Sequence, residues 1–173
     1  RFSFVVENTI DERKIKKTFS DLDMEIIVET DYNIAYKKAV GKFILFITDY
    51  NESDFMKQLE AILGLIEHSK DIGCIGTYGG NIALNDDKLL IHYTKSARSE
   101  VVFGNIFAFV RKTALRNGLR FPDRSDCHDA LFQMTDFSMQ MHIWGGRSNL
   151  SLTSVPIHLS KNLWNWYQNR WDY

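Results

Sequence analysis

Short apolar runs alternate with amphipathic stretches through the first half of the chain. Each run is nearly all apolar, which is typical of parallel strands whose two faces are both covered. The stretch from Glu52 to His68 differs, because its apolar residues recur at helical spacing. This alternation predicts βαβ units and a largely parallel sheet. The predicted strands are Phe2–Glu7, Met24–Val28, Phe43–Thr48 and Ile72–Gly76, and the predicted helices are Asp11–Phe19, Asn33–Val40 and Glu52–His68.

The second half predicts further strands and a long helix. Asn85-Asp86-Asp87 separates two apolar runs and is typical of a hairpin, and Val101–Val110 has the composition of another strand. A helix is expected from about Ser125 to Trp144, and a last strand from Leu150 to His158. On this helix we expect one stripe in the core (Ala130, Met134, Phe137, Met141, Trp144), and the adjoining stripe could face a cleft (Asp129, Phe132, Gln133, Asp136, Gln140).

Composition and charge narrow the classes of function. The 173 residues are 45% hydrophobic, enough for one substantial core. Lys and Arg number 21 against 22 Asp and Glu, so no net basic field attracts phosphate backbones or anionic lipid. We therefore expect no nucleic-acid partner. The two cysteines, Cys74 and Cys127, have neither zinc-site spacing nor the density of a disulfide scaffold, which favours a cytoplasmic protein with reduced thiols.

The chain begins at Arg1 without an initiator Met and enters a strand-like run at once. We expect it to have been excised from a longer polypeptide, whose remainder could supply a neighbouring domain or a membrane anchor. Its longest apolar run, Phe43–Ile47, is far shorter than the roughly 20 residues of a spanning helix.

Several segments, taken in order, resemble family-2-like glycosyltransferases with the GT-A fold. The first half carries Asn33-Ile-Ala-Tyr-Lys-Lys-Ala, then Gly41-Lys-Phe-Ile-Leu-Phe-Ile-Thr-Asp-Tyr, and then Ile72–Gly80. The second half carries Gly104–Lys112, the acidic helix segment Thr135–Gly145 and Val155–Ser160. The branch that is most similar includes a streptomycin-biosynthesis protein.

The resemblance implies one GT-A type domain over residues 1–173, with a mixed, mostly parallel central sheet flanked by helices. Residues 1–80 would form the nucleotide-binding half and residues 81–173 the acceptor-side half. The implied activity is transfer of a sugar from a UDP- or dTDP-linked donor to a glycan or small-molecule acceptor, in bacterial polysaccharide biosynthesis or secondary metabolism.

In this fold the donor lies across the carboxyl ends of the parallel strands. The candidate nucleotide-binding residues there are Glu7, Asn8, Glu29, Asp31 and Asp49.

The family's acidic motif holds a divalent cation, Mg²⁺ or Mn²⁺, against the two phosphates. Here the usual last Asp of the motif is Tyr50, and the carboxylate present is Asp49, one position earlier. Asp49 and His158 are the candidate metal ligands. The alternatives are that Asp49 caps the helix that begins near Ser53, and that His158 is a hydrogen-bonded structural residue.

Asp136 matches an acidic position of the family's helix motif, and Asp129 lies two helical turns before it. Either carboxylate could take the proton from an acceptor hydroxyl, and we favour Asp136. The position that often carries the base in inverting members is Met134 here. The alternatives are a solvated helix face for both residues and a helix-dipole interaction for Asp129.

Two interpretations compete with an active transferase. The substitutions Tyr50 and Met134 favour a catalytically degenerate GT-A-like domain that binds a sugar, a nucleotide or a partner domain. A flavodoxin-like module is disfavoured, since Gly76-Thr-Tyr-Gly-Gly is too loose for a phosphate-cradling loop. The aromatic tail, Leu163–Tyr173, is a candidate sugar-stacking platform, but packing onto the core, a twin subunit or a neighbouring domain is the stronger interpretation.

Overall fold

A computed structural model describes residues 1–7, 10–48, 52–85, 88–92, 98–123, 130–154 and 157–158. The elements follow one another as β1 (Phe2–Val6), α1 (Glu12–Thr18), β2 (Met24–Val28), α2 (Tyr32–Lys38), β3 (Phe43–Ile47), α3 (Glu52–His68), β4 (Ile72–Asn85), β5 (Lys88–His92), β6 (Arg98–Ser99), β7 (Val101–Val110), α4 (Arg111–Arg116), α5 (Ala130–Ile143), β8 (Ser148–Ser154) and β9 (Ile157–His158). No helix in these ranges combines the length and apolar character needed to cross a bilayer.

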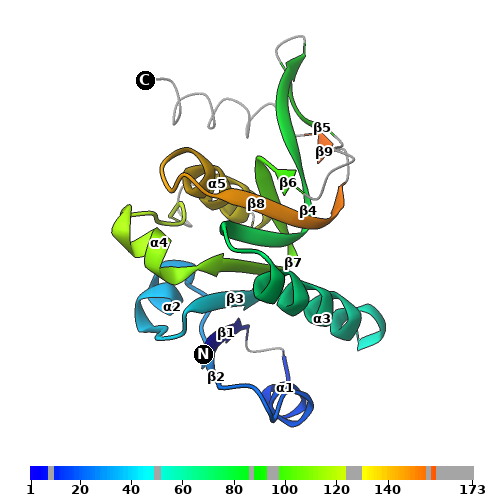
Figure 1. Cartoon of the computed structure of the whole chain (residues 1–173), viewed down its shortest axis with the longest axis vertical. Helices are drawn as coiled ribbons and strands as arrows, with labels where there is room; N and C mark the ends of the chain where they lie inside the picture. Colours follow the sequence, from blue (N-terminus) through cyan, green and yellow to red (C-terminus); the bar gives the residue numbers. More distant parts are fainter. Residues whose placement is uncertain are drawn as a thin grey trace.

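The strands form a mixed sheet in the order β2-β1-β3-β7-β4-β5-β9 (Figure 1). β1 lies between β2 and β3 and is parallel to both. β7 is antiparallel to its neighbours β3 and β4. β8 runs parallel to β4, and β6 pairs with β8. The predicted α/β class, with a mixed sheet flanked by helices, is confirmed. The sheet is not mostly parallel as expected, because among the described strands three pairs are parallel and five are antiparallel.

Two hydrophobic cores lie on opposite faces of this sheet. The first, here called the α2–α5 core, contains Ile44 and Phe46 of β3, and the second, the α1–α3 core, contains Leu45 and Ile47. Successive residues of a strand point to opposite faces, so a strand covered on both faces must be apolar at every position. This is why β3 is a continuous apolar run.

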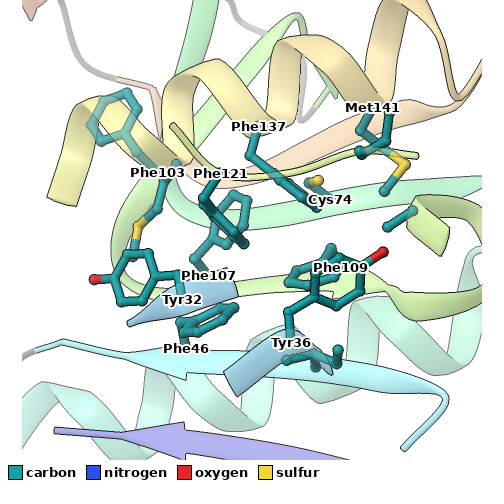
Figure 2. Close-up of a cluster of buried hydrophobic side chains, with 14 of the residues drawn as sticks. Tyr32, Tyr36, Phe46, Cys74, Phe103, Phe107, Phe109, Phe121, Phe137 and Met141 are labelled. Carbon is teal, nitrogen blue, oxygen red and sulfur yellow. The ribbon is translucent and has the colours of Figure 1, made fainter. Parts of the chain in front are cut away.

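The middle of helix α5 is buried on all sides, whereas Leu131 and Ile143 near its two ends are exposed. Every residue from Phe132 to Met141 is buried, and Phe137 stacks on Phe121 with ring centroids 4.2 Å apart (Figure 2). The described residues of the stripe that we expected to face a cleft, Phe132, Gln133, Asp136 and Gln140, are therefore covered, which corrects that expectation for them. Trp144 was assigned to the core stripe but is 50% exposed, because the helix ends at Ile143.

The glycine-rich part of β4 continues the strand past the predicted end at Gly76. A Cβ on Gly76 would lie 2.7 Å from the backbone N and O of Phe103, and one on Gly79 would lie 2.7 Å from the carbonyl of Val101. Glycine thus permits β4 and β7 to approach closely beside the register shift between Gly76 and Tyr78.

Of the two cysteines, Cys74 lies in the described part of the chain. It is a free thiol with no exposed surface, and burial raises its pKa well above the usual value. A thiol of this kind packs as a small apolar side chain.

Candidate functional site

The parallel unit β2-β1-β3 has a topological switch point at β1 and β3. From β1 the chain crosses through α1 to β2 on one side, and it returns through α2 to β3 on the other side. Side chains of α1 pack in one core and those of α2 in the opposite core. In open α/β sheets, ligands bind outside the carboxyl ends of the strands at this kind of point.

Two residues mark the edge of the sheet at the switch point. Val6 of β1 pairs with Ile47 of β3, so the residues that follow them, Glu7 and Thr48, lie at the same edge. Glu7 is half-buried, and its carbonyl accepts a hydrogen bond from the amide of Ile10 at 3.1 Å. The predicted placement of Glu7 at the carboxyl end of β1 is confirmed, and its contact with a nucleotide stays a prediction.

Asn105 joins this edge from the antiparallel strand β7, and our sequence analysis did not single it out. Its carbonyl accepts a hydrogen bond from the amide of Thr48 at 3.0 Å, and the residue is partly exposed. The sequence does set Asn105 apart, because it is the one residue of the strand Val101–Val110 with a polar side chain. The residue before it, Gly104, has a φ of 129°, so the strand is distorted beside the edge.

Glu29 follows β2 and organises the loop before α2. Its carboxylate accepts hydrogen bonds from Lys38 Nζ at 2.8 Å and from the amides of Thr30 and Asp31. The hydrogen bond from Lys38 is the main reason why the pKa of Glu29 lies below its usual value. The side chain is therefore a carboxylate at neutral pH, already engaged by these donors.

Asp31 is the N-cap of α2. Its Oδ1 accepts a hydrogen bond from the amide of Ile34 at 3.0 Å, and its backbone is extended, as N-caps require. The residue lies near the carboxyl end of β2, as predicted. Its local role in the structure is to begin the helix.

Asp136 lies in the middle of α5 with none of its surface exposed. Its Oδ2 accepts a hydrogen bond from Gln140 Nε2 at 2.6 Å. Met134 is buried as well. The structure thus places the favoured candidate for the base in the interior, where no acceptor reaches it without a rearrangement.

The two glutamines of α5 hold the segment that follows α4. Gln140 Nε2 donates to the carbonyl of Arg120 at 2.8 Å, and its Oε1 accepts from the amide of the same residue at 3.2 Å. Gln133 Nε2 donates to the carbonyl of Pro122 at 3.0 Å. Sequence reasoning placed both glutamines on the stripe expected to face a cleft, whereas both are buried. Their hydrogen-bond partners lie 11 and 20 positions away in the chain, and no local pattern identifies them.

Four candidate residues cannot be placed as side chains. Asn8, Asp49 and Asp129 lie outside the described residues, as does the aromatic tail. For His158 the structure gives the backbone, which pairs with Leu90 of β5. Within the described ranges, no group of three or more His, Cys, Asp or Glu side chains is arranged to hold a metal ion.

No protein-family model and no curated protein matches the sequence. Among solved structures, residues 1–349 of S. aureus TarS are 16% identical, with a TM-score of 0.49, over 90% of this chain and 59% of TarS. The complex of TarS 1–349 with UDP-GlcNAc is 15% identical, with a TM-score of 0.48, over 94% of this chain and 60% of that one. This chain thus spans about three-fifths of TarS 1–349. Identities and TM-scores at this level do not justify carrying any residue or activity over from TarS.

Proposed function

We propose that the chain is a glycosyltransferase that moves a sugar from a nucleotide-diphosphate donor to a glycan or small-molecule acceptor. The observation that carries the proposal is the switch point between β1 and β3, where Glu7, Thr48 and Asn105 border one edge of a parallel unit. Carboxylate, hydroxyl and amide groups at such an edge suit a ribose and a base, which present several hydrogen-bonding groups. The family resemblance of the sequence supplies the reaction class.

In this proposal the nucleotide lies across the carboxyl ends of β1, β2 and β3. Glu7, Asn8, Glu29 and Asp31 come from the loops that follow β1 and β2, and Asp49 follows β3. Glu29 and Asp31 would act chiefly by fixing the loop that leads into α2, because their carboxylates already accept backbone hydrogen bonds. Their backbone groups would then meet the ligand in a fixed arrangement.

Asp49 and His158 are the proposed ligands of Mg²⁺ or Mn²⁺, which when bound would offset the charge of the diphosphate leaving group. Asp136 or Asp129 is the proposed group that accepts the proton of the acceptor hydroxyl.

One observation favours a second candidate function. Asp136 and Met134 are both fully buried, so the acceptor side lacks an exposed carboxylate from the described part of α5. A catalytically degenerate domain, which binds a sugar, a nucleotide or a partner domain without turnover, is consistent with this burial.

A thermal-shift titration with UDP and dTDP, with and without Mn²⁺, tests nucleotide binding. A ligand at about 100 times its dissociation constant stabilises the fold by about 2.7 kcal/mol, which raises Tm by several degrees. Assays of nucleotide release from UDP- and dTDP-sugars then separate a transferase from a binding domain. If neither nucleotide raises Tm, the proposal is wrong.

Asp49→Ala is the variant that examines the metal role, with Asp54→Ala as its matched control on the exposed surface of α3. We expect Asp49→Ala to abolish the Mn²⁺-dependent part of the shift and the control to keep it. An unchanged Mn²⁺ dependence in Asp49→Ala would withdraw the metal assignment.

A further inference from the structure

Two adjoining hollows lie at the opposite end of the strands from the switch point. One, of about 400 Å³, is lined by Lys112, Thr113, Arg116, Asn117, Gly145 and Arg147. The other, of about 560 Å³, shares Lys112, Thr113 and Arg147 with it and adds Lys42 and Lys70 to its lining. We call the two together the cationic hollow.

Its position follows from the strand register. Phe43, the first residue of β3, pairs with Val110, the last residue of β7, and the chain continues from there into α4 (Figure 1). Ile72, the first residue of β4, pairs with Ser148, the first residue of β8. The hollow therefore lies at the amino ends of β3, β4 and β8. The length of β3 alone separates it from Thr48 by on the order of 15 Å.

The charge of the hollow is strongly one-sided. Among the described residues that line it, five are Lys or Arg and one, Glu67, is acidic. The chain as a whole has a formal net charge of −1, so this concentration of cations is local. A concave surface lined by one sign of charge attracts counter-ions more strongly than its net charge suggests.

Most of these cations have no ion-pair partner among the described residues, and the Lys42 ammonium lies 5.2 Å from the centroid of the Phe43 ring. Arg147 forms an ion pair with Asp71. Within the described ranges, Lys42, Lys70, Lys112 and Arg116 form no ion pair, and all four are exposed. Surface lysines and arginines often lie close to a carboxylate, as Lys16 lies close to Glu12 on α1. The unpaired charges gathered at one hollow leave room for an anionic ligand.

The donors suit phosphate groups. The guanidinium of Arg116 is a planar fork that can donate two parallel hydrogen bonds to one phosphate, and Lys112 of the same helix adds a point charge. Arg147 adds charge beside them, although it also contacts Asp71. Thr113 brings a hydroxyl to both hollows. We propose that the cationic hollow binds a ligand with several phosphate groups, at a site separate from the nucleotide edge.

Calorimetric titration with sodium tripolyphosphate, in low-salt buffer containing EDTA, tests this site. The variant Lys112→Gln/Arg116→Gln should bind on the order of 25-fold more weakly than the wild type, at about fivefold for each cation removed. Lys17→Gln/Lys57→Gln removes the same charge from exposed positions of α1 and α3, and should change the affinity less than twofold. Glu67→Gln, which removes the acid from the rim, should bind more tightly than the wild type.

A second arm identifies the source of the phosphates. Sedimentation with phosphatidylglycerol vesicles, compared with phosphatidylcholine vesicles, reports binding to lipid headgroups. Loss of vesicle binding in Lys112→Gln/Arg116→Gln would assign the phosphates to a membrane surface, whereas tripolyphosphate binding without vesicle binding would assign them to a soluble ligand. The proposal is overturned if the wild type binds neither probe, or if the control pair weakens binding as much as the α4 pair.

Discussion

Asn33 and Phe121 form two hydrogen bonds across 88 positions of the sequence. Asn33 Nδ2 donates to the carbonyl of Phe121 at 3.0 Å, and the amide of Phe121 donates to Asn33 Oδ1 at 3.0 Å. The Asn33 side chain thus bonds both the backbone amide and the carbonyl of Phe121, as a neighbouring strand would do, although Phe121 lies outside the sheet. This pairing fastens the chain after α4 to α2, and it positions Phe121 against Phe46 and Phe137 (Figure 2).

Replacing Asn33 should therefore destabilise the protein as a whole. Asn33→Ala leaves a buried amide and carbonyl without partners, which we expect to lower the free energy of unfolding by about 2–4 kcal/mol. Asn33→Asp keeps the acceptor but loses the donor, so its loss should be smaller. Urea denaturation measures both variants, and equal stability of Asn33→Ala and wild type would contradict the role of the pair.

Two glycines should respond to alanine in opposite directions. A Cβ on Gly41 would lie 2.6 Å from Ser3 N, so Gly41→Ala should cost about 1–3 kcal/mol through overpacking. Gly64 lies in α3 with nothing within 4 Å of an added Cβ, so Gly64→Ala should stabilise the fold by about 0.5–1 kcal/mol. Thermal unfolding of the two variants checks the contrast. A gain for Gly41→Ala would show that β1 and β3 are less tightly joined there.

The stability of the fold should depend on Glu25 in acid. Partial burial acts to raise the pKa of Glu25, but hydrogen bonds from Ser3 Oγ and from the Val40 amide outweigh it and place the pKa below the usual 4.5. A lowered folded-state pKa contributes stability above pH 4.5, and this contribution is lost as the pH falls through the folded-state value. Urea midpoints from pH 7 to pH 3 should fall less steeply for Glu25→Gln than for wild type, and parallel curves would refute the assignment.

Gln140 should matter for stability even if the chain proves inactive. Its side chain forms three hydrogen bonds, to the backbone N and O of Arg120 and to Asp136 Oδ2. We expect Gln140→Ala to cost about 2–4 kcal/mol of the free energy of unfolding, and Gln58→Ala on α3 to cost less than about 1 kcal/mol.

The variant Asp136→Asn separates the catalytic role of Asp136 from its structural role, because the base is lost while an acceptor for the Gln140 hydrogen bond remains. Full transferase activity in Asp136→Asn would withdraw the base assignment.

The apolar strands were predictable because burial on both faces gives a direct signal. The strand β3 ends at Ile47, one residue before its predicted end at Thr48, and β2 has the predicted bounds Met24–Val28. β4 was predicted too short, because glycines that permit the close approach of β7 are the same residues that mark loops in other sequences. A local sequence pattern does not show whether a glycine permits close approach of two strands or marks a loop.

The candidate site was predictable in part. Residues that follow parallel strands lie at the carboxyl edge by topology, so Glu7 and Glu29 were found from the order of elements. Asp136 was placed on a cleft-facing stripe by periodicity, but the middle of α5 is buried, and it packs in part against β4 and β7, which are distant in sequence. The cationic hollow gathers Lys42, Lys112 and Arg147 from three separate segments, and a balanced total charge conceals it.

Chemical-shift mapping of ¹⁵N-labelled protein with UDP tests the central claim most directly, because it locates the nucleotide on the fold. We predict that the amides of Glu7, Thr48 and Asn105 shift on titration, while those of Lys112 and Arg116 shift less. Shifts confined to the cationic hollow, or no shifts at all, would contradict a nucleotide site at the carboxyl ends of β1 and β3.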